Sequence, residues 1–158
     1  MKLLLLNISI AAAWLGISAT QNGVTFIIGL ILGFTLISLL EGFFQPPSYS
    51  RRILGFLAYL YYFSKALIIA NITMLTHILI TPNNKIEPNL VEIDIQGLSD
   101  IEILILTHSI TLTPGTITID ILKPEGKLLI HAFDGHTKEQ VEQSIAQDLT
   151  RHILRFTR

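Results

Sequence analysis

The pattern of apolar and polar residues divides the chain into a long apolar part and a second part in which the two kinds alternate. Leu3–Leu40 is almost entirely apolar and is interrupted near its middle by the polar segment 18–23. The segments 3–19 and 24–40 are each 17 residues long, so each helix would rise about 26 Å, against a hydrocarbon core of about 30 Å. Asn22-Gly23 suits a tight reversal because both residues tolerate positive φ. This pattern predicts a transmembrane helical hairpin.

A third apolar stretch, 53–80, is long enough to span a membrane but is amphipathic. On a helical wheel its apolar face comprises Phe56, Leu57, Leu60, Phe63, Leu67, Met74, Leu75 and Ile78. The opposite face comprises mainly Ala58, Tyr59, Tyr62, Lys65, Thr73, Thr76 and His77. This asymmetry predicts either a helix that lies in the membrane interface or a third span with a polar face.

The positions of the basic residues favour the interfacial helix. Lys and Arg residues that flank membrane spans prefer the cytoplasmic side. If only the hairpin spans, Lys2, Arg51, Arg52 and the C-terminal part all lie on that side, whereas a third span would place the C-terminal part opposite to them. We therefore predict a membrane region over 1–81 and a cytoplasmic domain over 82–158, with a third span as the open alternative.

Region 82–158 has the strand pattern of a small α+β domain. Residues 90–96 and 116–122 alternate between apolar and polar side chains, and 127–133 is expected to pair with the second of these strands as a hairpin. The side chains expected on one side of each strand are Val91, Ile93 and Ile95 in the first, which point inward, and Ile117, Ile119 and Ile121 in the second.

Two capping boxes predict the helices of this domain. Ser99 and Glu102 have the spacing of an N-cap and its reciprocal partner, and they open a helix that ends before Pro114. The segment 137–140 (Thr-Lys-Glu-Gln) opens a final helix. Its apolar face comprises Val141, Ile145, Leu149, Ile153 and Phe156. The resulting order, β-α-β-β-α, is that of a compact α+β unit.

Small residues line one face of each hairpin helix. Ala12 and Gly16 are four residues apart, and so are Gly29 and Gly33 in a GxxxG spacing. Helices in lipid associate by close packing, which small residues permit. The pattern leaves two alternatives open: a docking face for partner helices, or packing of the two faces on each other within the hairpin.

The hairpin lacks the groups that carry ions or protons through membranes. Leu3–Leu40 contains no Asp, Glu, Lys, Arg or His, and such groups usually mark a transport path. Glu41 follows the second helix, and we expect it to be solvated. Lys65 and His77 are also candidate ionisable groups near the membrane, for which snorkelling or interfacial solvation is the simpler interpretation.

Charge and residue types argue against several classes of protein. Residues 82–158 contain seven basic and eleven acidic groups, so no basic face for nucleic acid is indicated, and the chain has no Cys. His131, Asp134 and His136 cluster at a predicted strand end, but no metal-ligand spacing, phosphate loop or nucleophile motif accompanies them. We expect no catalytic residue, cofactor or metal site, and therefore no enzyme.

The N-terminus has a second interpretation as a signal peptide. Lys2 precedes an apolar segment, and Ile17-Ser18-Ala19 resembles a cleavage site. A second apolar segment follows after only a few residues, as in a hairpin. We therefore favour the hairpin.

The most distinctive local sequence is 111–116, Thr-Leu-Thr-Pro-Gly-Thr. Pro114 ends a helix, Gly115 permits a sharp bend, and the hydroxyls of Thr111, Thr113 and Thr116 are available to freed backbone groups. These residue types predict a structural turn between helix and strand.

The longer motif around this turn identifies a family likeness. Residues 109–120 (SITLTPGTITID), followed by 129–132 (LIHA), resemble the small E-type component of the Mrp/Mnh/Pha multisubunit cation/proton antiporters. Chain length, the apolar N-terminal part and the terminal domain agree with this family. The resemblance therefore covers essentially the whole chain, although the membrane part agrees by hydropathy alone.

This resemblance implies an accessory subunit of a Na⁺/H⁺ antiporter complex in the cell membrane. Large antiporter-like subunits and other small membrane subunits would be its partners, and the large ones would carry the ion path. A related subunit occurs in membrane-bound hydrogenase-type complexes. A free-standing, membrane-anchored regulatory or ligand-binding module is the other alternative.

Overall fold

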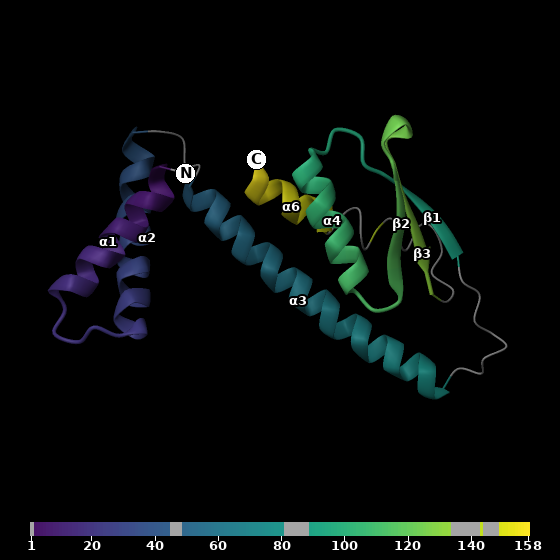
Figure 1. Ribbon diagram of the computed structural model, residues 1–158, viewed down its shortest axis with the longest axis horizontal. Helices are drawn as coiled ribbons and strands as arrows, with labels where there is room; N and C mark the ends of the chain where they lie inside the picture. The colour runs from purple at the N-terminus through teal and green to yellow at the C-terminus, as the bar shows by residue number, and fades with distance from the viewer. Residues whose placement is uncertain (1, 45–48, 81–88, 134–142, 144–148) are drawn as a thin grey trace. The chain divides into compact units, whose positions relative to one another are not determined.

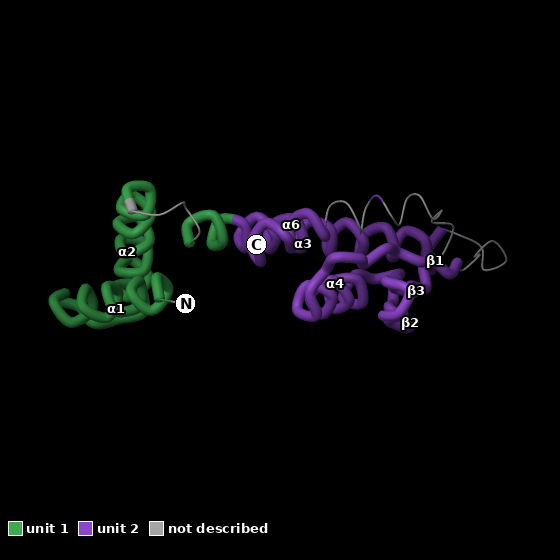
Figure 2. The backbone as a smooth tube through the Cα atoms, turned by 90° about the horizontal axis from the view of Figure 1, so that it is seen from above, with its two compact units in different colours: residues 1–54 green, residues 55–158 purple. Residues whose placement is uncertain are grey.

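The computed structural model describes residues 2–44, 49–80, 89–133, 143 and 149–158. It combines long helices with a small antiparallel sheet, as the sequence predicts (Figure 1). The described elements are α1 (Lys2–Ile17), α2 (Gly23–Phe44), α3 (Tyr49–Ile80), β1 (Asn89–Asp94), α4 (Asp100–Leu112), β2 (Thr116–Leu122), the short 3₁₀ helix η2 (Lys123–Glu125), β3 (Lys127–Ala132) and α6 (Thr150–Thr157). They form two compact units, residues 1–54 and 55–158 (Figure 2).

In the first unit, α1 and α2 pack against each other in antiparallel orientation. Gly29 of α2 lies against Ala11 of α1, and Gly33, one turn later, lies against Asn7, one turn earlier. The side chain of Asn22 starts α2 by accepting a hydrogen bond from the Thr25 N–H at 2.9 Å, which is the usual role of an N-cap. The reversal predicted at Asn22-Gly23 is therefore reinforced by a cap.

Two described helices are long and apolar enough to cross a membrane. The mean hydropathy of an 18-residue window reaches 2.4 within Gly23–Phe43 and 1.7 within Tyr49–Ile80. Helix α1 is apolar but shorter, at 16 residues. Helix α2 extends four residues beyond the predicted end at 40, to Phe44.

The second unit is built on a three-stranded antiparallel sheet in the order β1-β3-β2. Its core forms where the buried side chains of β1 and β3 meet those of α4 and α6. The buried members of this core are Val91, Ile93, Ile95, Ile103, Leu106, Ile110, Leu128, Ile130, Ala132, Leu149 and Ile153. Val91, Ile93 and Ile95 point inward as predicted.

Strand β2 departs from the predicted alternation. Ile117 lies opposite His131, whereas Ile121 lies opposite the fully buried Leu128, and the register shifts between Thr118 and Asp120. Such a bulge moves one residue out of the ladder and reverses which face the following side chains take. The expectation that Ile117, Ile119 and Ile121 share one side is therefore wrong.

The part of α3 around Tyr59 and Phe63 packs against the α+β domain. Tyr59 and Phe63 are half-buried against the core, and the Tyr59 ring lies 5.3 Å from that of Phe156 on α6. The Tyr59 hydroxyl is 2.6 Å from the Ser109 hydroxyl of α4. The contact thus combines Tyr59, from the face predicted to be polar, with Phe63, from the face predicted to be apolar. The boundary between a membrane region over 1–81 and a cytoplasmic domain over 82–158 remains a prediction. The compact units of the structure divide at a different place, 54/55.

Some predicted features lie outside the described residues. They are the second capping box at 137–140, the side chains of Val141 and Ile145, and the link at 46–47. The described part of the final helix is α6, in which Ile153 is buried and Phe156 is half-buried.

Candidate functional site

Glu41 caps the start of α3. Its carboxylate accepts hydrogen bonds from the backbone N–H groups of Tyr49, at 2.6 Å, and Ser50, at 3.1 Å. The first N–H groups of a helix have no partner within the helix, and its dipole favours a negative charge there. Glu41 is only 6% exposed. The expectation that it is solvated is therefore wrong, because the start of α3 returns to this carboxylate.

A second buried polar contact connects the same helix start to α1. The Asn7 amide donates a hydrogen bond to the Tyr49 hydroxyl at 2.8 Å, and Asn7 is 5% exposed. The Tyr49 ring also lies 6.1 Å from that of Phe34 on α2. Tyr49 therefore holds both helices of the hairpin. Hydropathy could not indicate this residue, since it lies in the polar link after α2.

The two glycines of the GxxxG spacing face α1. A Cβ at Gly29 would lie 2.9 Å from the Ala11 Cα and 3.2 Å from the Trp14 Cβ. A Cβ at Gly33 would overlap the Asn7 side chain. Both positions thus lie in the packing within the hairpin, but against Ala11 and Asn7 rather than against the predicted Ala12/Gly16 face.

Ala12 and Gly16 occupy a different face of α1. Both are exposed, and nothing lies within 4 Å of a Cβ built at Gly16. The structure therefore does not bring them together with Gly29 and Gly33. Docking of partner helices remains a prediction for this face alone.

The 111–116 motif forms the junction between α4 and β2. The Thr113 hydroxyl donates to the Ser109 carbonyl at 2.8 Å, and the Thr116 hydroxyl donates to the Ile110 carbonyl at 2.8 Å. Thr111 accepts a hydrogen bond from the Thr118 N–H at 3.4 Å. The hydroxyls thus bond to backbone groups at the end of α4 and in β2, where the regular hydrogen-bond pattern of a helix or sheet is incomplete.

Gly115 connects this junction to the sheet. Its φ of +93° lies in the region that favours glycine. Its carbonyl accepts a hydrogen bond from the Phe133 N–H at 2.7 Å, just after β3. Pro114 follows the C-cap Thr113. The described contacts of the motif are those of a structural turn between α4 and β2.

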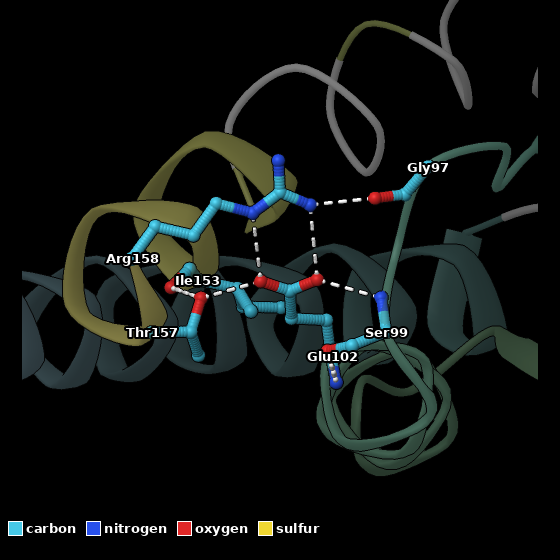
Figure 3. Close-up of polar contacts among 6 residues, drawn as sticks. All are labelled: Gly97, Ser99, Glu102, Ile153, Thr157 and Arg158. Atoms are coloured by element: carbon cyan, nitrogen blue, oxygen red, sulfur yellow. Dashed lines mark hydrogen bonds and ion pairs between the residues drawn. The ribbon is translucent and has the colours of Figure 1, made fainter.

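Glu102 is the centre of the densest polar network in the described part of the α+β domain (Figure 3). Its carboxylate accepts from the Ser99 N–H at 2.7 Å, from the Thr157 hydroxyl at 2.7 Å, and from Arg158 twice at 3.2 Å. Arg158 also donates to the Gly97 carbonyl at 2.6 Å. The network joins the start of α4 to the end of α6. The predicted capping box is confirmed, whereas the Arg158 contact could not be predicted from sequence spacing.

The pKa of Glu102 follows from these partners. The pKa is lowered from 4.5 to about 2; the hydrogen bond from Arg158 is the largest cause, and the Ser99 and Thr157 bonds act in the same direction. Burial of a side chain that is 3% exposed opposes them. The carboxylate is therefore ionised at neutral pH and stabilises the fold in that form.

The other candidate ionisable groups do not meet at one site. Lys65 is exposed and His77 is half-buried, both on α3, and His131 is half-buried on β3. Asp134 and His136 lie outside the described residues. Among the residues that the structure describes, no group of three His, Cys, Asp or Glu side chains is placed to hold a metal ion.

Comparison with known proteins gives a likeness over the whole chain. A family model described as "Na+/H+ ion antiporter subunit" matches residues 7–156. The chain is similar to the E-type Na⁺/H⁺ antiporter subunit of Alkalihalophilus pseudofirmus, with 32% identity over 155 residues and 98% of each chain covered.

Two solved structures are also similar. A chain of the membrane-bound sulfane sulfur reductase, an archaeal respiratory membrane complex, matches with a TM-score of 0.57 and 26% identity, covering 96% of each chain. A chain of the Mrp complex from Dietzia sp. DQ12-45-1b matches with a TM-score of 0.47 and 26% identity, covering 70% of this chain and 99% of that one.

Proposed function

This chain belongs to the E-type family of Na⁺/H⁺ antiporter subunits, and we propose that it is an accessory component of a multisubunit Na⁺/H⁺ antiporter complex in the cell membrane. The observation that carries this proposal is the match of the family over residues 7–156. Its partners are the other membrane subunits of such a complex. The relatives support this, because each is named as an antiporter subunit. Relatives such as that of Alkalihalophilus pseudofirmus are named as antiporter subunits, and we propose for this chain a supporting role without catalysis.

The chemistry of the first unit supports assembly rather than ion conduction. The segment Leu3–Leu40 has no titratable group. Glu41, the acid next to it, accepts hydrogen bonds from the first backbone N–H groups of α3. Gly29 and Gly33 bring α2 against the backbone and side chains of α1. These are features of a packed helical element, whereas an ion path needs ionisable or coordinating groups at depth.

For the membrane topology we propose that α1 and α2 span as a hairpin and that α3 lies in the cytoplasmic interface. The α+β domain covers Tyr59 and Phe63 on α3, so this half of the helix faces a domain with a charged surface. The half after Phe63 includes Lys65, Asn71 and His77. A helix in the membrane interface can contact the domain with its first half and expose the polar residues of its second half to the headgroup region. The domain then lies on the cytoplasmic side, as does Lys2.

Single cysteines test this topology, because the chain contains none. In intact cells a membrane-impermeant maleimide should label Gln21→Cys, between α1 and α2, but should label Glu125→Cys on η2 only after permeabilisation. Both positions are exposed. Labelling of Glu125→Cys in intact cells would instead support α3 as a third span.

Co-purification tests the proposed membership of a complex. A tagged chain extracted in mild detergent should be recovered with large and small membrane subunits in fixed ratios. A parallel extraction in harsh detergent, which separates weakly held subunits, controls for non-specific aggregation. Recovery of the chain alone from mild detergent as a stable small oligomer would contradict the proposal and favour a free-standing module.

A second parent complex has one observation in its favour. The match with the archaeal respiratory membrane complex covers 96% of this chain, so a related chain is used outside antiporters. The subunits recovered with the tagged chain distinguish the two, because reductase subunits would accompany only the respiratory assembly.

A further inference from the structure

The Lys and Arg side chains that the structure describes in the second unit divide into two groups. Lys123, Lys127 and Arg158 form ion pairs within the domain, with Asp100, Glu92 and Glu102 respectively. Lys65, Arg151 and Arg155 are exposed and have no acidic partner among the residues that the structure describes. We call these three residues the basic rim.

The basic rim lies along the contact between α3 and α6. The Arg155 carbonyl lies 3.0 Å from a Cβ built at Gly55, and the His152 ring stacks on Tyr62 at 4.0 Å. Arg151 and Arg155 are one turn apart and so share one face of α6. Both are exposed, whereas Ile153 is buried. Both views of the second unit show α6 alongside α3 (Figures 1 and 2).

Lys65 extends this basic surface along α3. It follows Tyr62 by three residues and therefore lies on the same side of the helix, one turn further along. The rim thus runs from Arg155, beside Gly55, through Arg151 to Lys65. No acidic residue occurs in α3 or α6, so the positive charge along this contact is not neutralised within these helices.

Apolar side chains border the rim on α3. Tyr61, Ile68 and Ile69 lie three or four residues from Lys65 and are 66%, 61% and 52% exposed. Exposed apolar residues beside long cationic side chains are typical of a helix that lies in the boundary between acyl chains and headgroups. Guanidinium groups bind phosphate oxygens through paired hydrogen bonds.

We propose that the basic rim binds the headgroups of anionic phospholipids in the cytoplasmic leaflet. The rest of residues 82–158 is acidic on balance, so the rim is the part of the domain with charge complementary to an anionic surface. Headgroup binding holds α6 and the attached α+β domain against the membrane. The proposal rests on the interfacial placement of α3.

The test uses the purified full-length chain in a neutral detergent and counts bound lipids by native mass spectrometry. Dioleoyl phosphatidylglycerol is titrated against dioleoyl phosphatidylcholine, which has the same acyl chains. The wild-type chain should prefer phosphatidylglycerol, and about 0.5 M salt should weaken this preference by screening. Lys65→Gln/Arg151→Gln/Arg155→Gln should reduce the preference at least tenfold, because each cation near an anionic headgroup contributes to attraction.

Two matched variants make the result specific. Lys123→Gln removes one exposed charge from the same domain, on η2, and should leave the preference unchanged. Lys65→Arg/Arg151→Lys/Arg155→Lys keeps the charge at all three positions and should retain most of it. Thermal unfolding in phosphatidylcholine shows that the neutralised variant is folded.

Equal phosphatidylglycerol preference in the wild-type chain and the folded triple Gln variant would overturn the proposal. So would an equal loss of preference in Lys123→Gln, which would indicate a general charge effect. If the triple Gln variant keeps its lipid preference but no longer co-purifies with the other subunits, the rim binds a protein partner instead. If lipid binding fails while the variants still co-purify with the other subunits, only the lipid proposal fails. The proposed membership of a complex is then unaffected.

Discussion

Gly29→Leu is expected to separate α1 from α2 and to lower the stability of the hairpin by about 3 kcal/mol, at the upper end of the cost of overpacking. The first atom of the new side chain would lie 2.9 Å from the Ala11 Cα and 3.1 Å from its carbonyl oxygen. These are backbone atoms, so no side-chain rotation relieves the overlap. Helix α1 must move, and the close packing that small residues permit in lipid is lost.

The single tryptophan of the chain reports on this contact directly. The Trp14 Cβ lies 3.2 Å from a Cβ at Gly29, so Trp14 emission followed during heating in detergent monitors the separation of the helices. Gly42→Leu is the matched control on the same helix, because nothing lies within 4 Å of a Cβ at Gly42. Equal melting of the Gly29→Leu and Gly42→Leu chains would show that the α1–α2 packing contributes little.

Glu102→Gln is expected to destabilise the α+β domain by about 3 kcal/mol at pH 7 and to remove most of its sensitivity to acid. The pKa of Glu102 falls from 4.5 to about 2 on folding, and a shift of this size corresponds to about 3 kcal/mol. Because the folded pKa is the lower one, the stabilisation is complete above about pH 4.5 and is lost as the pH falls toward 2. The neutral amide cannot form the ion pair with Arg158.

Denaturant unfolding of the full-length chain, followed by far-UV circular dichroism between about pH 7 and pH 2.5, measures this difference. Glu92→Gln removes a carboxylate whose ion pair with Lys127 is largely exposed and should change the free energy of unfolding little. The difference in stability between the wild-type chain and Glu102→Gln should shrink below about pH 4.5 and fall to about 1 kcal/mol or less at about pH 2.5. A constant difference between them at every pH would mean that packing, rather than ionisation of Glu102, stabilises the domain.

The sequence could predict the elements whose signals are local. Hydropathy located the three long helices, alternation located Val91, Ile93 and Ile95, and the Ser99/Glu102 spacing located a cap that the structure confirms. Each of these depends on residues a few positions apart, so the information is present in a short window.

Features that depend on contacts between distant residues could not be predicted. Glu41 looked like a solvated acid because nothing in its neighbourhood shows that the start of α3, eight residues later, returns to it. The contact of Arg158 with Glu102 joins residues 56 positions apart. The bulge between Thr118 and Asp120 follows from the register with β3, which the alternation of β2 does not contain.

The exposed isoleucines of β2 show the same limit. Ile117 and Ile119 are 49% and 53% exposed, although an alternating apolar pattern ordinarily indicates a buried face. In a component of a larger complex, the chain's own core need not cover every apolar side chain. Periodicity therefore identifies an apolar face of a strand. Whether that face packs in the chain's own core or against a partner has to be found by experiment.

Our central claim is that this chain supports an antiporter without providing its ion path. Na⁺-driven proton movement in membrane vesicles tests it most directly, with complexes that carry Glu41→Gln or His77→Gln and with activity normalised to the amount of assembled complex. We predict that both variants require the same Na⁺ concentration as the wild-type complex for half-maximal activity. A shifted Na⁺ requirement in either variant, at a normal amount of complex, would contradict the claim.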